Sequence, residues 1–250
     1  MGIAHPQSLP KSTEISGFVI LVQINSETKK PSPRPIHLFR MPITVLIVDD
    51  HELIHNGINS MLMETNAEII GNAFNTEDAI RLTEELGPDL VILDVLLVGT
   101  SGIETLERIL TVRPGTKVVM FSTFANPTYV ARSIIWGASD YLVKSAGRGE
   151  LLSTISRATQ GIDPPEHSLF SRIKELMSRR KDKHLTAYKL TNREVQVLRH
   201  LGLGLSNAEI AKSLEISIET VKEHVQNILR KTNAVDRTQV AVWAVRERLI

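Results

Sequence analysis

Short, almost wholly apolar runs alternate with amphipathic stretches between residues 43 and 160. Strands of a parallel sheet that are buried on both faces read as continuous apolar runs, so the alternation favours an open sheet covered by helices. The pattern predicts an α/β, doubly wound sheet of five parallel strands. The strands are expected at Thr44–Val48, Glu68–Ala73, Leu90–Leu93, Lys117–Phe121 and Asp140–Val143, and the helices near 52–64, 76–86, 102–112, 127–136 and 148–160.

The first of these helices shows the 3.6-residue period of a helix with one apolar face. The positions that carry this period are Leu53, Gly57, Ile58, Met61 and Leu62. They are expected to face the sheet.

Four further helices are predicted after Lys189, because their start signals have the spacing of capping boxes or single capping side chains. These signals are Thr191-x-x-Glu194, Ser206-x-x-Glu209, Ser217 and Asp236-x-x-Gln239. Apolar positions three or four apart give the helices buried stripes. A small all-α domain is therefore expected over residues 187–250, and the two helices between Ser206 and Lys231 have the form of a helix-turn-helix.

Two segments interrupt the pattern. Residues 1–40 are rich in proline, lysine and serine, which favours a disordered extension or a start codon placed too early before Met41. The apolar run Ile15–Ile24 leaves a signal peptide as a third interpretation.

Pro164-Pro165 ends the last helix of the sheet domain, and the charged stretch after it predicts a linker over 161–186 with room for one short helix. The sheet domain itself would span residues 41–160.

Charge separates the two predicted domains. Residues 1–40 carry a net charge of +3, residues 41–163 carry −8 and residues 164–250 carry +6. This asymmetry suggests that only the C-terminal part meets nucleic acid, since phosphate neutralisation supplies most non-specific affinity. The absence of cysteine excludes thiolate metal sites and cysteine nucleophiles. No apolar run approaches the roughly 20 residues that span a bilayer, so a cytoplasmic protein without membrane contact is expected.

Polar side chains follow four of the predicted strands: Asp49-Asp50, Asp94, Ser122 and Lys144. Because ligands bind beyond the carboxyl ends of parallel strands, these side chains are expected to converge. Three carboxylates packed together require a cation, and oxygen ligands suit Mg²⁺. A metal and a lysine beside a free carboxylate can support phosphoryl transfer, with Asp94 as acceptor. Each residue alone could be an ordinary turn or cap, so the interpretation depends on their joint placement.

Residues 41–160 resemble a response-regulator receiver domain. The resemblance rests on V-D-D at residues 48–50, L-D at 93–94 with Gly102 eight positions on, Ser122, and Y-L-V-K at 141–144. It implies a flavodoxin-like fold and a sensor histidine kinase that phosphorylates Asp94. One departure is visible, because Val98 stands where the family usually has proline, and the shape of that loop is left open.

The resemblance also implies a role for each matching residue. By position, Mg²⁺ would be held by Asp50, Asp94 and the backbone carbonyl of Leu96, with Asp49 as the supporting acid. Ser122 would be the switch hydroxyl, Tyr141 the switch aromatic and Lys144 the partner of the phosphate.

The second helix of the helix-turn-helix offers polar groups to DNA on the side opposite its apolar stripe. The outward positions are Thr220, Lys222, Glu223, Gln226, Asn227 and Arg230. An ordinary solvated helix face gives the same pattern, so charge alone does not decide between the two.

Residues 190–250 resemble the LuxR-type DNA-binding domain through L-T-N-R-E-V-Q-V-L, S-N-A-E-I-A-K-S-L, T-V-K-E-H-V and R-T-Q-V. Together the two halves are similar to the NarL/FixJ family of response regulators. This resemblance implies double-stranded DNA as a partner and a homodimer when the chain is phosphorylated or bound to DNA. Lys222 would enter the groove, Thr220 and Lys231 would approach phosphates, and Glu194 would pair with Arg237.

Two rival functions remain open. An aspartate-nucleophile phosphohydrolase also combines a strand-end aspartate with Mg²⁺, but such enzymes need a second acid two residues later, where this chain has Leu96. A DNA-binding protein that works without phosphorylation is the other rival, and the complete set of Asp50, Asp94, Ser122 and Lys144 argues against it.

Overall fold

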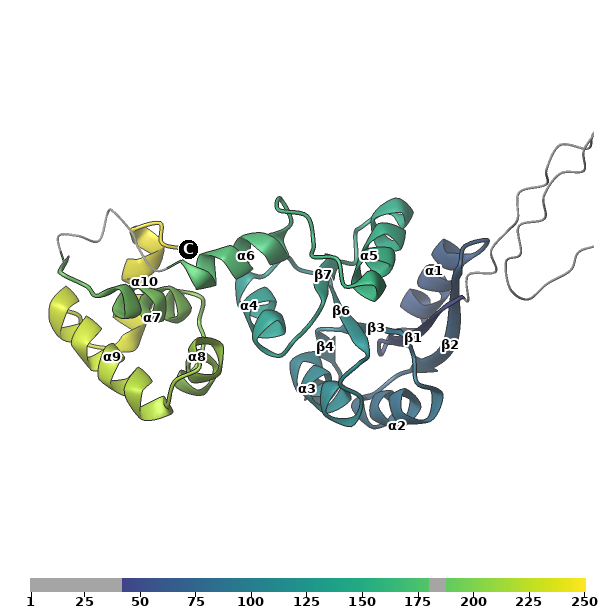
Figure 1. Ribbon diagram of the computed structural model, residues 1–250, viewed down its shortest axis with the longest axis horizontal. Helices are drawn as coiled ribbons and strands as arrows, with labels where there is room; N and C mark the ends of the chain where they lie inside the picture. Colours follow the sequence, from purple (N-terminus) through teal and green to yellow (C-terminus); the bar gives the residue numbers. More distant parts are fainter. Residues whose placement is uncertain (1–41, 180–187) are drawn as a thin grey trace, which may run out of the picture. The chain divides into compact units, whose positions relative to one another are not determined.

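The structure of the protein is a computed structural model that describes residues 42–179 and 188–250 (Figure 1). Five parallel strands form one sheet in the order β2-β1-β3-β6-β7. Their bounds are β1 Ile43–Val48, β2 Ala67–Ala73, β3 Leu90–Asp94, β6 Lys117–Ser122 and β7 Asp140–Val143. The strand and helix pattern predicted from the sequence is confirmed for this part of the chain.

Helices cover both faces of the sheet. They are α1 Glu52–Leu62, α2 Thr76–Leu86, α3 Gly102–Val112, α4 Pro127–Ile135 and α5 Arg148–Gln160. Successive side chains of a strand point to opposite faces, so β1 contributes Val45 and Ile47 to the cluster with α1 and α5, and Leu46 and Val48 to the other cluster, with α2, α3 and α4. This two-sided burial explains why the strands are apolar throughout.

A small antiparallel hairpin follows β3 and was not predicted. It pairs β4 Leu96–Leu97 with β5 Thr100–Ser101 across a turn at Val98 and Gly99. Gly99 has φ +81°, a conformation that side chains with a Cβ rarely adopt. The hairpin therefore shows how the loop closes without the proline that the family usually carries at position 98.

The C-terminal part is helical, as predicted, with α7 Asn192–Gly202, α8 Asn207–Leu214, α9 Ile218–Thr232 and α10 Arg237–Arg246. Thr191 with Glu194 and Ser206 with Glu209 form complete capping boxes, and Ser217 caps α9. Asp236 accepts the backbone N–H of Gln239 at the start of α10. These contacts satisfy backbone donors that would otherwise be left unpaired at each helix start.

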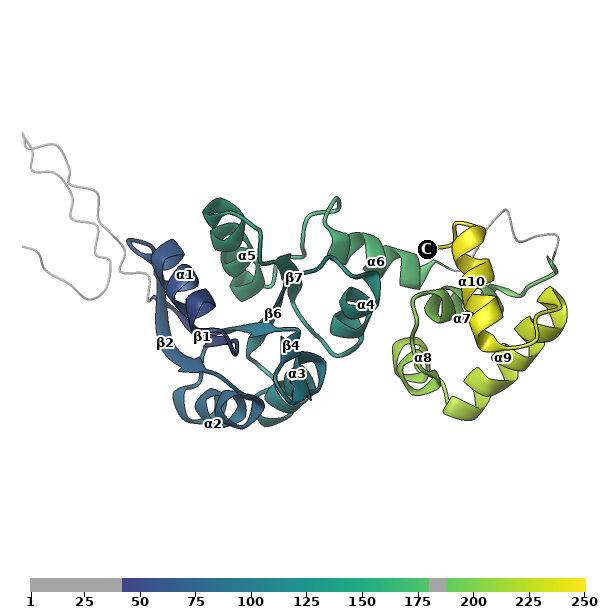
Figure 2. The same ribbon diagram turned by 180° about the vertical axis from the view of Figure 1, so that it is seen from behind.

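Helix α6, Leu169–Ser178, lies within the predicted linker. Its side chains Phe170, Ile173 and Met177 are buried, and the helix packs against α4, beside which it lies in both views (Figures 1 and 2). The predicted linker therefore contains one short helix, as the sequence pattern allowed. The expectations for residues 1–40 fall outside the described residues.

Candidate functional sites

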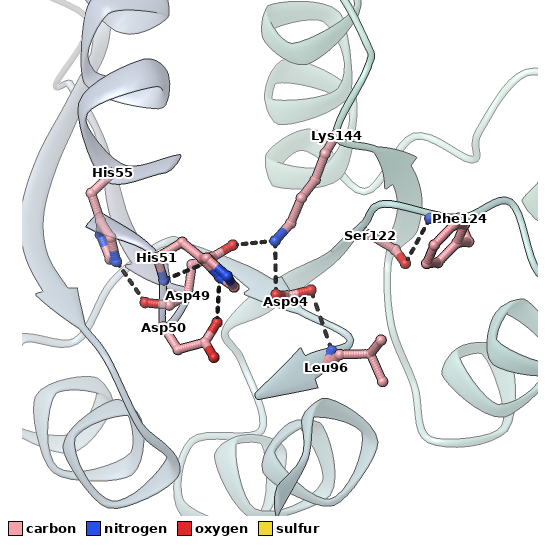
Figure 3. A network of polar contacts seen from close by, with 9 residues as sticks. All are labelled: Asp49, Asp50, His51, His55, Asp94, Leu96, Ser122, Phe124 and Lys144. Carbon is pink, nitrogen blue, oxygen red and sulfur yellow. Dashed lines mark hydrogen bonds and ion pairs between the residues drawn. The ribbon is translucent and has the colours of Figure 1, made fainter. Parts of the chain in front are cut away.

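The carboxyl edge of the sheet gathers the polar residues that the sequence singled out. Asp49 and Asp50 follow β1, Asp94 ends the adjacent strand β3, Ser122 ends β6, and Lys144 follows β7. Figure 3 shows the ammonium of Lys144 between the carboxylates of Asp49 and Asp94. The parallel topology explains the convergence, because all five strands end at this edge.

Two short ion pairs join this group. The Nζ of Lys144 lies 2.6 Å from Oδ2 of Asp49 and 2.7 Å from Oδ2 of Asp94. Burial alone would lower the pKa of Lys144, but its hydrogen bonds to the two carboxylates outweigh that effect and the pKa is raised. Burial raises the pKa of Asp94, with the Lys144 contact opposing it. Lys144 thus stays charged beside Asp94.

The carboxylates retain acceptor capacity that a cation would use. Asp49 Oδ2 and Asp50 Oδ1 are buried, and among the described residues each has one cationic or imidazole neighbour, Lys144 Nζ at 2.6 Å and His51 Nδ1 at 2.7 Å respectively. Together with His51, the three aspartates place one ligand atom each within 4.8 Å of one another. A site of this composition fits a hard divalent ion. His51, which directly follows Asp50, was not among the site residues predicted from the sequence.

The Leu96 backbone borders the same pocket. Its N–H donates to Oδ1 of Asp94 at 3.3 Å. In an antiparallel pair the N–H and C=O of one residue point to the same side, so the Leu96 carbonyl also points outward from the hairpin, on the Asp94 side. This orientation agrees with the ligand role that the sequence resemblance implies.

Ser122 and Tyr141 both contact the backbone of Phe124. Ser122 Oγ accepts the N–H of Phe124 at 3.3 Å, and the Tyr141 hydroxyl donates to the Phe124 carbonyl at 2.7 Å. Tyr141 is buried, and this burial raises the pKa of its hydroxyl. Among the described residues, no hydrogen bond joins the Ser122 side chain to Asp94. Phe124 could not be identified from its residue type, because it contributes through its backbone N–H and carbonyl.

The outward face of α9 matches the one predicted for the second helix of the helix-turn-helix. Val221, Val225 and Ile228 are buried, as the stripe requires. The exposed residues of the opposite side are Lys222, Glu223, Gln226 and Arg230, while Thr220 and Asn227 are half-buried. Lys222 Nζ lies 3.2 Å from Oε1 of Glu219, one turn earlier.

The predicted pair between Glu194 and Arg237 is wrong. Glu194 Oε2 instead lies 2.7 Å from Nζ of Lys231, because the last turn of α9 packs beside the start of α7. Arg237 donates to the backbone carbonyl of Leu205 at 2.7 Å. Burial would raise the pKa of Glu194, but hydrogen bonds from Lys231 and Thr191 outweigh it and the pKa is lowered. The Lys231 ammonium is thus engaged within the domain, which weakens its expected role toward DNA phosphates.

A buried histidine joins α7 to α8. His200 Nδ1 lies 2.7 Å from the backbone carbonyl of Gln196, which can only accept, so Nδ1 carries the proton and Nε2 accepts from Ser213 Oγ at 2.8 Å. Burial lowers the pKa of His200 from its ordinary 6.5, and the neighbouring Arg193 and Arg199 lower it further. The folded domain therefore favours neutral His200.

Because His200 is buried in its neutral form, we expect the free energy of unfolding to decrease at acidic pH. A lowered folded-state pKa means that the unfolded chain binds the proton first, so stability is full above pH 6.5 and falls below it. The slope from this one group is at most about 1.4 kcal/mol per pH unit. Urea unfolding followed by Trp243 fluorescence in a Trp136→Phe background should show this slope. His200→Gln should flatten it, and an identical slope in both proteins would assign it to other groups.

The two parts of the described chain match two different family models. Residues 45–156 match the response regulator receiver domain, and residues 188–244 match the bacterial regulatory proteins of the luxR family. A receiver followed by a LuxR-type domain defines a DNA-binding response regulator of a two-component system. Among the described residues, no helix is long and apolar enough to cross a membrane.

Relatives of full length support the same assignment. The response regulator protein VraR of Staphylococcus saprophyticus is 34% identical over 211 residues, which cover 84% of this chain and 100% of that protein. VraR of Staphylococcus aureus is 33% identical over 211 residues, which again cover 84% of this chain and 100% of that protein. The RcsB response regulator of Salmonella typhimurium has the same fold, with 20% identity, coverage of 83% of this chain and 100% of that chain, and a TM-score of 0.52. The chain therefore belongs to the NarL/FixJ family of response regulators.

Proposed function

We propose that the chain regulates transcription and that Asp94 receives a phosphoryl group from the phosphohistidine of a sensor histidine kinase. The observation that carries the proposal is the contact of Lys144 with both Asp94 and Asp49 in a pocket at the carboxyl edge of the sheet. In the transfer, an Asp94 oxygen forms a bond to phosphorus while the phosphorus–nitrogen bond to the kinase histidine breaks. Lys144 neutralises the oxygens of the transferred group.

Mg²⁺ completes the proposed pocket. Asp50, Asp94 and the Leu96 carbonyl would hold the ion, with Asp49 as the supporting acid, and the three carboxylates that lie with His51 within 4.8 Å of one another support this assignment. When bound, the ion supplies a positive charge that offsets repulsion between the carboxylates and the incoming phosphoryl oxygens.

The switch is proposed to involve Ser122 and Tyr141. Phosphate on Asp94 offers the Ser122 hydroxyl a charged acceptor, so Ser122 would leave the backbone N–H of Phe124 and donate to phosphate. The Phe124 segment would then move, and with it the carbonyl that holds Tyr141. The position two residues after Asp94, where a phosphohydrolase would carry its second acid, is Leu96, which favours a regulator over an enzyme.

Double-stranded DNA is the proposed partner of the C-terminal part, and α9 is proposed to enter the major groove. Lys222, Glu223, Gln226 and Arg230 are exposed on the side of α9 that faces away from the domain core. Thr220 is proposed to approach phosphates. RcsB, which shares the fold, has been solved in complex with DNA. We also propose that the chain forms a homodimer when it is phosphorylated or bound to DNA, and that it acts in the cytoplasm.

Lys222→Ala is expected to weaken operator binding without unfolding the domain, because the exposed ammonium contacts only Glu219 within the part of the chain described. The loss should be about 1–3 kcal/mol if Lys222 reads a base. Fluorescence anisotropy at fixed salt, with a melting curve, measures both effects. Arg246→Ala, which removes an equal charge from α10, is the control. Unchanged DNA affinity in Lys222→Ala would make this side of α9 an ordinary solvated face.

Opposite charge on the two halves also predicts a closed resting form. Residues 41–163 carry −8 and residues 164–250 carry +6. Weak attraction between tethered domains could then compete with DNA until phosphorylation changes the receiver surface. A fragment beginning near residue 186 should therefore bind DNA more tightly than the unphosphorylated chain, with phosphorylation closing much of the gap. If receiver-driven dimerisation alone controls binding, the fragment will be no tighter than the resting chain at the same salt concentration.

A further inference from the structure

His55 is a buried polar residue of α1 that has no part in the function proposed above. Its side chain is 5% exposed and shares the buried side of the helix with Ile58 and Leu62. A buried imidazole needs hydrogen-bond partners to offset its lost hydration. Its partners lie in β2 and in the segments directly after β1 and β2, and not on α1 itself.

Three elements meet at the His55 ring. Nε2 lies 2.7 Å from the backbone oxygen of Asp49, and because a carbonyl can only accept, Nε2 is the donor. Nδ1 lies 2.8 Å from the side-chain amide of Asn72 on β2, and because Nε2 carries the ring proton, Nδ1 is the acceptor and the NH2 end of that amide is the group that can donate to it. The ring centroid also lies 4.5 Å from that of Phe74. His55 therefore connects α1 with the ends of β1 and β2, and Figure 3 shows its bond to Asp49 within the pocket network.

The carbonyl that His55 holds belongs to the peptide group between Asp49 and Asp50. A peptide group is planar, so a hydrogen bond to its oxygen restricts rotation of the whole unit, and with it ψ of Asp49 and φ of Asp50, two of the angles that set where the side chains point. One side chain contacts Lys144 at 2.6 Å and the other is a proposed metal ligand. Without the imidazole, the buried Asp49 carbonyl would lose its hydrogen-bond donor. Rotation of the peptide group toward another donor would then become favourable.

We propose that His55 is a positioning residue of the phosphoryl-acceptor pocket, which holds the Asp49–Asp50 peptide so that both carboxylates face the cation and Lys144. The inference rests on the proposed function of that pocket. His55 contacts none of the reacting atoms and acts only through the Asp49 carbonyl.

Two amide substitutions separate this role from packing. His55→Gln places its amide nitrogen near the position of Nε2 and can still donate to Asp49. His55→Asn places its amide near Nδ1, so it keeps the contact with Asn72 and loses the one with Asp49. Both lose the ring contact with Phe74. Calorimetry on the unphosphorylated full chain measures the Mg²⁺ dissociation constant, and the melting temperature without metal reports on folding.

We expect His55→Asn to weaken Mg²⁺ binding about tenfold, at the lower end of the effect of losing an outer-shell partner, and His55→Gln to stay near wild type. Labelling by acetyl phosphate at low Mg²⁺ should follow the same order. If His55→Asn does not fold, His55→Met serves as the variant without a donor.

Equal Mg²⁺ constants for the Gln and donor-free variants would assign His55 to packing alone and overturn the inference. A wild-type chain that binds no Mg²⁺ would instead overturn the proposed metal pocket, and the inference with it. The first result appears only between variants and the second already in the wild type, so the two failures are distinguishable.

Discussion

Acetyl phosphate with Mg²⁺ is expected to add one phosphoryl group to the wild-type chain and none to Asp94→Asn. Asp94 is 5% exposed, contacts Lys144 at 2.7 Å and lies beside the carboxylates that would hold the cation. Asparagine preserves the shape of the side chain but has no carboxylate oxygen to attack phosphorus. The labelled fraction should therefore fall from most of the protein to none that intact-mass spectrometry detects.

Asp89→Asn provides the matched control for this experiment. Asp89 immediately precedes β3, at the other end of the strand that Asp94 terminates, and its carboxylate accepts from Thr44. The control should label as the wild type does. Equal labelling of Asp94→Asn and wild type would show that the acceptor is another residue, while labelling that persists in EDTA would remove the metal from the proposal.

The sequence predicted the sheet well because burial on both faces leaves a simple pattern. The strands β1, β3 and β6 are apolar in every central position, and the polar residues that meet at one edge lie at or directly after their carboxyl ends. Capping boxes likewise located α7 and α8, since a capping side chain and its partner lie only three residues apart. Local signals of this kind can be read without knowing the tertiary structure.

Contacts between distant segments were harder to predict. The sequence placed Leu53 on the apolar stripe of α1, but its side chain is 80% exposed, and the buried side contains His55 in place of a hydrophobic residue. The signal that could have found His55 is its spacing of three and seven residues from Ile58 and Leu62. Its partners Asp49, directly after β1, and Asn72 on β2 could not be foreseen, because their positions depend on strand register.

The pairing of Glu194 failed for a similar reason. The resemblance suggested Arg237 as the partner, but the geometry of helix packing brings Lys231 of α9 to the start of α7. Either cation satisfies the charge of Glu194, so charge alone could not choose between them. The hairpin after β3 was missed because each of its strands has only two residues and neither shows an alternating pattern.

Gly102→Ala is expected to destabilise the receiver domain and to abolish labelling of Asp94. Gly102 begins α3, and its N–H donates to the carbonyl of Val95 at 2.9 Å. A Cβ at this position would lie 1.9 Å from the backbone oxygen of Asp94, which no ordinary adjustment of a side chain can relieve. The start of α3 or the end of β3 must therefore move, and overpacking of this kind typically costs about 1–3 kcal/mol and occasionally more.

The effect on labelling follows from which atoms would move. The Asp94 carbonyl is in the same residue as the proposed acceptor carboxylate, and the hairpin that carries the Leu96 carbonyl closes at Gly102. A shift here displaces the acceptor and a proposed metal ligand together. Gly57→Ala is the control, because a Cβ there meets nothing within 4 Å and alanine favours the helix by about 0.5–1 kcal/mol. Urea unfolding and acetyl phosphate labelling of the two variants measure both effects. A Gly102→Ala protein with wild-type stability and labelling would show that the close approach of α3 to Asp94 does not constrain the pocket.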